Sequence, residues 1–345
     1  MKYILTFMVT AWCSMVRADI TTSEKYDFVV SIPDVHGDFD VLLRALWMAK
    51  IEVDGSNSAG EFDNFINSFE NAIKADLPRK RNENARVLLV QTGDIIDRGA
   101  ASLSCYKAIW QVEGLLGWDL INLVGNHEVM TMAGQADNYA HPADVREFGS
   151  LKARRAAFSP GGKIWTKIID EFQFMAKINM GSESILFVHA GMHPKWLKQV
   201  RRSSVDELNA FLMDELLKNP SSPVLVSAIS PIWTREMAQD VDDVVCKRLL
   251  PPVQQTLKVS RIVVGHTPQE TLTTTSRCDA QILLADVAMS RWMGSGKNGN
   301  PAALIFSLSE KGQKLTRIYN VYWRNGQVVD QPIASLVDDS SSHEL

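Results

Sequence analysis

The sequence has little of several features that would classify a protein at once. Its 345 residues include only 4 cysteines, too few for a disulfide-built scaffold. The formal net charge is only −4, so bulk charge gives no support for a nucleic-acid or anionic-membrane surface. It has no N-glycosylation acceptor, because Asn219-Pro220-Ser221 is blocked by its proline. At 46% hydrophobic residues, the chain is not disordered, collagen-like or a coiled coil, and one large or two ordinary domains remain.

Long apolar runs are also rare, and the one that stands out begins the chain. Lys2 precedes a mostly apolar run over residues 3–16, and Val16-Arg17-Ala18 fits a signal-peptide cleavage site. The run is too short for a transmembrane helix, which needs about 20 apolar residues. We therefore predict a signal peptide over residues 1–18 and a mature chain that enters the secretory pathway, in the endoplasmic reticulum lumen or outside the cell. An uncleaved amphipathic or organelle-targeting segment is the alternative. No other stretch is long enough to span a bilayer, so no membrane span is expected after cleavage.

Removal of this leader changes both charge and cysteine content. It takes away two basic residues and Cys13, so the formal net charge changes from −4 to −6. Cys105, Cys246 and Cys278 remain, and three cysteines cannot all pair within one chain. In an oxidising lumen, one disulfide and one buried thiol are expected. Cys246–Cys278 is a guess, because spacing does not determine connectivity.

The other end of the chain is polar. Residues 331–345 are assigned to a tail that follows a domain over residues 19–330. The tail ends in Ser342-His343-Glu344-Leu345, which weakly resembles the KDEL/HDEL signal for retention in the endoplasmic reticulum. Its last two residues fit that signal and its first two do not. A frayed polar terminus is the alternative.

Short apolar runs alternate with helical segments along the chain. The predicted strands cover residues 26–32, 86–91, 120–124, 184–188, 260–264, 281–285, 303–306 and 318–322. Helices are predicted near residues 39–50 and 101–115. Continuous apolar runs of this length are typical of strands covered on both faces, and alternation with helices favours α/β layers. Polar segments at about 52–85 and 135–163 interrupt the pattern as insertions.

Metal-ligand residue types follow directly after several of these predicted strands, where open α/β folds place their sites. The segments are Asp34-Val35-His36-Gly37-Asp38, Gly93-Asp94-Ile95-Ile96-Asp97-Arg98-Gly99, Gly125-Asn126-His127-Glu128, His189-Ala190-Gly191 and Gly265-His266-Thr267. One such segment alone is more often structural. All of them in this order, each at the end of a predicted strand, indicate a metal centre.

The segments resemble the motifs GDxHG, GDxxDRG, GNHE, HGG/HAG and GH of the metallophosphoesterase superfamily, and within it the phosphoprotein phosphatase family, over about residues 34–266. Three further segments are similar to extra motifs of the bacterial-like Shewanella-type protein phosphatases. They are Arg155-x-x-Phe158-x-Pro160-Gly161, Pro231-Ile232-Trp233-Thr234-Arg235 and Asp286-Val287-Ala288-Met289-Ser290. The resemblance implies an α/β metallophosphoesterase fold, a central β-sandwich flanked by helices, with helical insertions.

The chain departs from the family pattern at two positions. Pro33 stands where glycine usually precedes the first aspartate, so this turn must be built without that N–H group. Ala288 stands where glycine is more usual. Neither departure removes a predicted ligand.

The resemblance implies two divalent cations as cofactors. Asp34, His36 and Asp94 would bind one ion, and Asp94, Asn126, His189 and His266 the other, with Asp94 bridging. Such oxygen and imidazole ligands suit manganese, iron, zinc or magnesium, with manganese expected in vitro. Two ions can clamp a phosphoryl group and lower the pKa of a bridging water, whose hydroxide would attack phosphorus directly.

The remaining roles also follow from the resemblance. His127 would be the general acid that protonates the leaving oxygen, and Asp97 would orient it. Arg98 and Arg235 would bind phosphate oxygens through bidentate contacts. Among neighbouring residues, Glu128 is expected to hold the Asn-His turn rather than react.

Two more polar residues receive structural interpretations. Asp38 is expected to cap the following helix, and His193 to be a site-edge or structural residue rather than a ligand.

We therefore predict a binuclear metal-dependent phosphomonoesterase that acts on phosphorylated proteins and not on nucleic acid. The sequence leaves phospho-Ser/Thr, phospho-Tyr and a regulatory subunit open. The closest alternative is a hydrolase of small phosphorylated metabolites or dinucleoside polyphosphates with the same metal cage. A non-enzymatic binding module is disfavoured, because the full ligand set and His127 are present.

Overall fold

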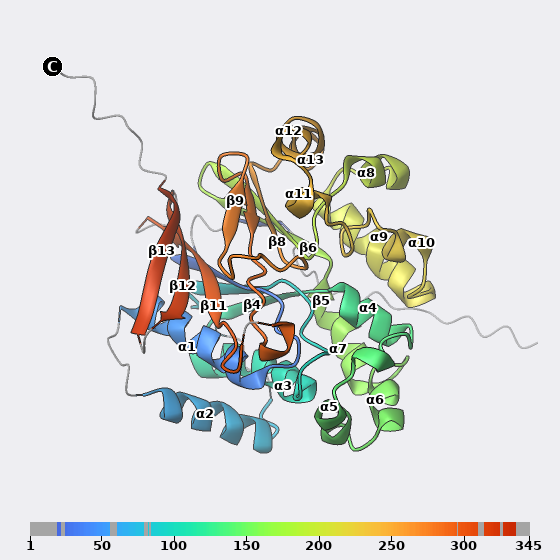
Figure 1. Cartoon of the computed structure of the whole chain (residues 1–345), viewed down its shortest axis with the longest axis vertical. Helices are drawn as coiled ribbons and strands as arrows, with labels where there is room; N and C mark the ends of the chain where they lie inside the picture. The colour runs from blue at the N-terminus through green and yellow to red at the C-terminus, as the bar shows by residue number, and fades with distance from the viewer. Residues whose placement is uncertain are drawn as a thin grey trace, which may run out of the picture.

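The computed structural model describes residues 19–21, 25–55, 61–78, 82, 84–294, 296–309, 314–324 and 327–335. The predicted signal peptide and the segment Ser342–Leu345 lie outside the described residues. Two β-sheets form the centre of the molecule, and helices lie around them (Figure 1). This arrangement confirms the predicted α/β layers.

The larger sheet has seven strands in the order β13-β12-β11-β2-β3-β4-β5. The strands are β2 (Phe28–Ile32), β3 (Val87–Gln91), β4 (Asp119–Leu123), β5 (Phe172–Gln173), β11 (Ala302–Leu308), β12 (Leu315–Arg324) and β13 (Gln327–Ser335). β2, β3, β4 and β5 pair in parallel, while β11, β12 and β13 extend the sheet in antiparallel pairing. The carboxyl ends of β2, β3 and β4 therefore lie at one edge.

The second sheet has six strands in the order β1-β6-β7-β8-β10-β9. The strands are β1 (Asp19–Thr21), β6 (Met175–Met180), β7 (Glu183–Val188), β8 (Arg261–Val264), β9 (Thr275–Arg277) and β10 (Ile282–Leu284). β7, β8 and β10 pair in parallel, with Val188 beside Val264 and Val264 beside Leu284. Their carboxyl ends are thus level with one another.

The helices of the first half of the chain are α1 (Phe39–Asp54), α2 (Phe62–Lys74), α3 (Ser102–Leu116), α4 (Asn126–Met132), α5 (Pro142–Glu147), α6 (Leu151–Ala157) and α7 (Lys163–Glu171). Those of the second half are α8 (Pro194–Val200), α9 (Val205–Lys218), α10 (Pro223–Val226), α11 (Glu236–Gln239), α12 (Asp242–Val244) and α13 (Leu250–Leu257). Short 3-10 turns cover Asp137–Tyr139 and Arg291–Met293, and a π-helical turn covers Val245–Leu249. The predicted insertion at 52–85 contains α2, and the one at 135–163 contains α5 and α6.

Burial explains why the central strands read as continuous apolar runs. Every residue of β3 is buried, because one face packs against the other sheet and the other against helices. Val29, Val90, Phe187 and Phe306 belong to one buried cluster drawn from both sheets. The rings of Phe187 and Phe306 lie 5.6 Å apart in an edge-on arrangement. The two sheets therefore form a sandwich with its own apolar core.

Some expectations need correction. All eight predicted strands are present, but β1, β5, β6, β9 and β13 were not predicted. β13 includes residues 331–335, so the boundary of the predicted tail at residue 331 is wrong. The guessed Cys246–Cys278 disulfide is present, and Cys105 is a buried free thiol, which confirms that part of the prediction. Within the described ranges, no helix is both long and apolar enough to cross a membrane.

Candidate active site

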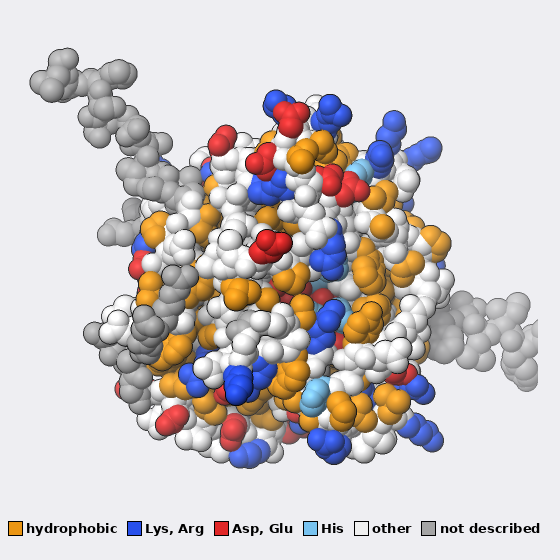
Figure 2. All heavy atoms as spheres, viewed as in Figure 1, with side chains coloured by type: hydrophobic (Ala, Val, Ile, Leu, Met, Phe, Trp, Pro, Cys, Tyr) orange, Lys and Arg blue, Asp and Glu red, His pale blue; other side chains and the backbone are white. Residues whose placement is uncertain are grey.

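The predicted site lies where the carboxyl ends of strands from both sheets meet. Five predicted ligands follow directly after strands: Asp34 after β2, Asp94 after β3, Asn126 after β4, His189 after β7 and His266 after β8. Contacts cross between the sheets here, since the backbone N–H of His266 donates to both carboxylate oxygens of Asp34 at 3.1 Å. Figure 2 shows acidic and histidine atoms recessed near the middle of this face, with Lys and Arg side chains around them.

The first two motif loops are joined by their backbones. The N–H groups of Val35 and His36 donate to the carbonyl oxygen of Asp94 at 3.1 and 2.9 Å. The turn after Pro33 is therefore held by the N–H groups of Val35 and His36. As a result, Asp34 and His36 lie beside Asp94.

Several residues of this site have strained backbones. Several non-glycine residues have positive φ angles: His36 (45°), Asp94 (53°), Asp97 (72°), Arg98 (63°) and His266 (63°). Such conformations cost on the order of 1 kcal/mol or more each and are typical of functional sites. Ala288 also has a positive φ, 52°, which explains why glycine is favoured at this position in the family that the motif resembles.

The hydrogen bonds of His36 and His189 determine which ring nitrogen is available. Nδ1 of His36 lies 3.2 Å from the carbonyl oxygen of Ile96, and Nδ1 of His189 lies 2.9 Å from that of Thr92. A carbonyl oxygen can only accept, so Nδ1 carries the proton in both rings. Each Nε2 is left as a lone-pair donor facing Asp94, at 3.7 Å for His36 and 3.5 Å for His189.

The side chains of His266 and Asn126 also have environments that suit a metal ligand. Nε2 of His266 is buried and has no hydrogen-bond partner within the part of the chain that the structure describes. Nε2 of His189 lies 2.9 Å from Oδ1 of Asn126. Because Nδ1 of His189 carries the proton, Nε2 of His189 and Oδ1 of Asn126 both offer lone pairs. Lone pairs that converge without a hydrogen between them suit a shared metal ion.

Three buried carboxylates add negative charge to the same place. Asp34, Asp94 and Asp286 are each no more than 2% exposed. Burial raises the pKa of Asp34 and of Asp94 well above the ordinary value, and neighbouring carboxylates raise both further. Burial also raises the pKa of Asp286, to about 6. Carboxylates this close and this dry are stabilised by a bound cation.

Glycines allow this close packing. A Cβ atom on Gly265 would lie 2.3 Å from Oδ2 of Asp34, and one on Gly125 would lie 2.1 Å from Oδ1 of Asp94. Both distances are far below van der Waals contact, so any side chain at either position would displace a predicted ligand.

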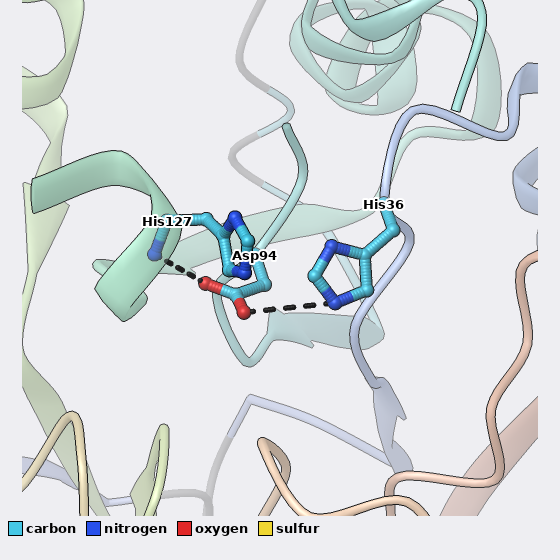
Figure 3. A group of neighbouring side chains, drawn as sticks. All are labelled: His36, Asp94 and His127. Atoms are coloured by element: carbon cyan, nitrogen blue, oxygen red, sulfur yellow. Dashed lines mark hydrogen bonds and ion pairs between the residues drawn. The ribbon is translucent and has the colours of Figure 1, made fainter. Parts of the chain in front are cut away.

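Among the described residues, the side chains that could hold metal ions form two groups that share one residue. His36, Asp94 and His127 form one group, and Asp94, His189 and His266 form the other (Figure 3 shows the first). In each group the candidate ligand atoms all lie within 4.8 Å of one another. Asp94 belongs to both, which is the geometry required of a bridging carboxylate.

His127 has a different environment from the other histidines. Its Nδ1 lies 2.7 Å from Oδ2 of Asp97, and its backbone N–H donates to Oδ1 of Asp94 at 2.9 Å (Figure 3). The structure thus brings together the predicted acid and its predicted orienting carboxylate. A hydrogen bond from Nδ1–H to a carboxylate leaves Nε2 free to exchange a proton with a bound substrate.

Three cations surround this pair. Burial and the charges of Arg98, Arg154 and Arg235 lower the pKa of His127 to about 3. Burial raises the pKa of Asp97 to about 6, although Arg154 opposes that rise. Without a bound anion, therefore, the imidazole is neutral and Asp97 is ionised near neutral pH.

The two predicted phosphate-binding arginines both lie at the site. The backbone N–H of Arg98 donates to the carbonyl of Tyr139 at 2.7 Å, and its guanidinium lies 5.5 Å from that ring. Nη1 of Arg235 donates to the carbonyl oxygen of His266 at 2.8 Å and to Oγ1 of Thr267 at 3.2 Å. Arg235 is exposed and Arg98 is half-buried, and Nε of Arg98 is buried without a hydrogen-bond partner among the described residues, so both side chains can bind an incoming anion.

Sequence reasoning missed two site residues. Asp286 was noted only as part of a motif, although it lies among the buried carboxylates. Arg154 was not noted; it is 1% exposed and its Nη2 lies 2.5 Å from Oδ1 of Asp97. Arg154 precedes Arg155, which belongs to one of the segments singled out in the sequence, and this position could have drawn attention to it.

Glu128, Asp38 and His193, for which structural roles were predicted, make structural hydrogen bonds. The Glu128 carboxylate accepts backbone N–H groups, Asp38 caps α1 by accepting from the N–H of Val41, and His193 caps α8 by accepting from the N–H of Lys195. Figure 1 places α1 and α8 on different sides of the sheets. None of these residues is needed as a metal ligand.

Comparisons with known proteins agree with this geometry. The sequence matches the family described as calcineurin-like phosphoesterase over residues 29–270. It is 27% identical over 313 residues to an uncharacterised protein of Schizosaccharomyces pombe, which covers 88% of this chain and 84% of that protein. It is 25% identical over 304 residues to Shewanella-like protein phosphatase 1 of Plasmodium berghei, covering 81% of this chain and 74% of the other.

A solved structure has a similar fold. The cold-active protein-tyrosine phosphatase of a psychrophilic Shewanella species matches with a TM-score of 0.64 and 20% sequence identity. The match covers 92% of this chain and 82% of that one. At this identity the likeness concerns the fold alone.

Proposed function

The chain belongs to the calcineurin-like phosphoesterase family, and from that premise we propose that it is a phosphomonoesterase with two divalent metal ions that acts on phosphoproteins. The observation that carries the proposal is the position of Asp94, which lies in both groups of potential ligands. We assign Asp34, His36 and Asp94 to one ion. Asp94, Asn126, His189 and His266 are assigned to the other.

The two metal ions, when bound, would supply Lewis acidity and a water of lowered pKa at the phosphoryl group. The protein's own groups perform the remaining tasks. Arg98 and Arg235 bind the non-bridging phosphate oxygens and orient the ester. Carbonyl groups of Ile96 and Thr92 hold the tautomers of His36 and His189, so that both rings keep a lone pair toward the ions.

His127 acts as the general acid and Asp97 orients it. A phosphate dianion between Arg98 and Arg235 offsets two of the three cations that lower the pKa of His127. Substrate binding therefore favours the protonated imidazole, which donates its Nε2 proton to the leaving oxygen. Asp97 holds the opposite side of the ring at 2.7 Å and stabilises the imidazolium.

The similarity to a protein named Shewanella-like protein phosphatase supports a phosphoprotein substrate. The exposed ring of Tyr139 beside His127 offers a contact for substrate residues that flank the phosphate. Manganese is the expected ion in vitro. We also propose passage through the secretory pathway, which is consistent with the Cys246–Cys278 disulfide.

Asp94→Asn tests the metal-based reaction. We expect at least about a hundredfold loss of kcat/KM with an aryl phosphate and manganese, since metal ions contribute several kcal/mol to stabilising the transition state. Metal analysis should show fewer ions bound per chain. Full activity in this variant, or in wild-type protein after confirmed metal removal, would contradict the proposal.

The substrate class needs a separate experiment. We would compare kcat/KM for phosphoserine, phosphothreonine and phosphotyrosine peptides with that for small phosphorylated metabolites and dinucleoside polyphosphates. Higher values for the peptides are expected. The opposite order would favour a small-molecule hydrolase that uses the same residues.

A further inference from the structure

A buried series of charged side chains continues beyond the His127–Asp97 pair. Oδ1 of Asp97 accepts from Nη2 of Arg154 at 2.5 Å, and Nε of Arg154 donates to Oδ2 of Asp144 at 2.8 Å. Asp97 and Asp144 have fully buried side chains, and Arg154 is 1% exposed. This series of side chains therefore links the imidazole of His127 to α5 and α6, the two helices of the insertion at 135–163.

Asp144, at the other end of this series, is also held in place. Oδ1 of Asp144 accepts the backbone N–H of Ser102 at 2.8 Å, and Oγ of Ser102 accepts the backbone N–H of Asp97 at 3.2 Å. The network thus closes into a ring that includes Arg154. The rings of Phe148 and Phe158 each lie 5.9 Å from its guanidinium carbon and leave it little room to move.

Arg154 bridges two buried carboxylates, those of Asp97 and Asp144. Without the guanidinium, both carboxylates would lose their charged partner, and an unpaired buried charge is costly. Asp97 would then also lose the contact that fixes its orientation.

We infer that Arg154 and Asp144 are positioning residues, which hold Asp97 in the orientation that fixes the Nδ1 proton of His127. The inference rests on the proposed function in one respect, the role of His127 as general acid. Arg154 and Asp144 are both buried, so neither is exposed to an incoming substrate. A purely structural role, anchoring α5 and α6 to the core, would explain the ion pairs but not their extension to the catalytic imidazole through Asp97.

Arg154→Gln tests the inference with two substrates that differ in their need for an acid. Phenyl phosphate releases a phenol with a pKa near that of tyrosine, about 10, and needs the proton. Dinitrophenyl phosphate releases a much more acidic phenol and does not. We expect Arg154→Gln to lower kcat for phenyl phosphate by about a hundredfold, the scale of general acid catalysis, and to spare dinitrophenyl phosphate. KM should be little changed for either substrate.

Arg155→Gln is the matched control. Arg155 is the next residue on α6, is largely exposed and pairs at the surface with Asp137. Its replacement should leave both rates unchanged. Arg154→Lys is the conservative variant: it keeps a cation but cannot span both carboxylates, so an intermediate, equally substrate-selective loss is expected. Equal losses for both substrates, or no loss, would overturn the inference.

A spectroscopic measurement separates failure of this inference from failure of the proposed function. In magnesium-loaded protein, the Nδ1 proton of His127 should give a downfield proton NMR signal, assigned by its absence in His127→Gln. The signal should persist in Arg155→Gln and disappear or move upfield in Arg154→Gln and Asp144→Asn. An unchanged signal in Arg154→Gln would overturn the positioning role. This measurement requires no phosphatase activity, so it still decides the question if the wild-type protein hydrolyses neither ester.

Discussion

The carboxylate of Glu128 accepts the backbone N–H of Asp94 at 2.9 Å, so the third motif loop holds the second in place. The same carboxylate accepts the N–H groups of Ile95 and Gly125, each at 2.9 Å, and the hydroxyl of Tyr106 at 3.0 Å. One fully buried side chain thereby satisfies donors on two loops and a helix. This position makes Glu128 a support for Asp94, the proposed bridging ligand, rather than a reacting group.

Glu128→Gln should destabilise the protein although it preserves side-chain size. The amide has one acceptor oxygen, so its NH₂ group would face donors that one carboxylate oxygen now satisfies. Leaving buried donors unpaired costs about 1–3 kcal/mol each. We expect a loss of that order in the free energy of unfolding, measured by urea denaturation. Tyr106→Phe, which removes only one donor, should cost less; a larger effect there than in Glu128→Gln would contradict this account.

Asp286→Asn should have opposite effects on stability and on metal binding. In metal-free protein, burial raises the pKa of Asp286 to about 6 from an ordinary value of 3.8. Its ionised form therefore costs stability, on the order of 3 kcal/mol above pH 6. The neutral amide avoids this cost and can still accept from the N–H of Ala288. We expect the metal-free variant to melt higher than wild type at pH 7.5.

The pH dependence of this difference follows from the direction of the shift. A carboxyl with a raised pKa in the folded state loses its penalty as pH falls from about 6 toward 3.8, because it then takes up a proton. The advantage of Asp286→Asn should therefore shrink over that range and vanish near pH 4. Manganese should raise the melting temperature of the wild type more than that of the variant. A variant that is less stable than metal-free wild type at pH 7.5 would refute the repulsion argument.

The residues proposed as ligands could be selected from the sequence because each lies in a short motif directly after an apolar strand. Register between the parallel strands β2 and β3 brings Asp34 and Asp94 together. His266 follows β8 of the other sheet and reaches Asp34 through the packing of the two sheets. Asp286 also follows a predicted strand, over residues 281–285, so the same local signal was available for it and was not used; the pairing of β10 beside β8 places it among the other carboxylates. Arg154 lies in an insertion whose packing against Asp97 likewise depends on tertiary structure.

The missed strand β13 has a different explanation. It is an edge strand, and Pro332 lies within it opposite Tyr319. Proline lacks an N–H group and normally lowers the expectation of a strand, but an edge strand tolerates it. Polar composition and this proline therefore made residues 331–335 resemble a tail.

Tyr139→Ala should weaken substrate binding. The ring lies 5.1 Å from that of His127, is 42% exposed and has the guanidinium of Arg98 beside it. An aromatic contact of this kind contributes about 0.5–1.5 kcal/mol. We expect KM for phosphopeptides to rise roughly two- to tenfold, measured by initial rates. Tyr139→Phe keeps the ring and should behave as wild type; a comparable KM increase in that variant would assign the effect to the hydroxyl instead.

Loss of the Cys246–Cys278 disulfide should affect stability more than catalysis. The bond closes a loop with a sequence separation of 32 and ties the π-helical turn Val245–Leu249 to the end of β9. Constraining a loop of this length in the unfolded chain is worth about 3–4 kcal/mol. The double variant Cys246→Ser/Cys278→Ser should lose about that much in urea unfolding. Its kcat at 25 °C should stay near wild type, because Arg277, beside Cys278, still donates to the carbonyl of Met237. A large loss of kcat in the folded double variant would instead mean that the disulfide sets the position of the neighbouring Arg235.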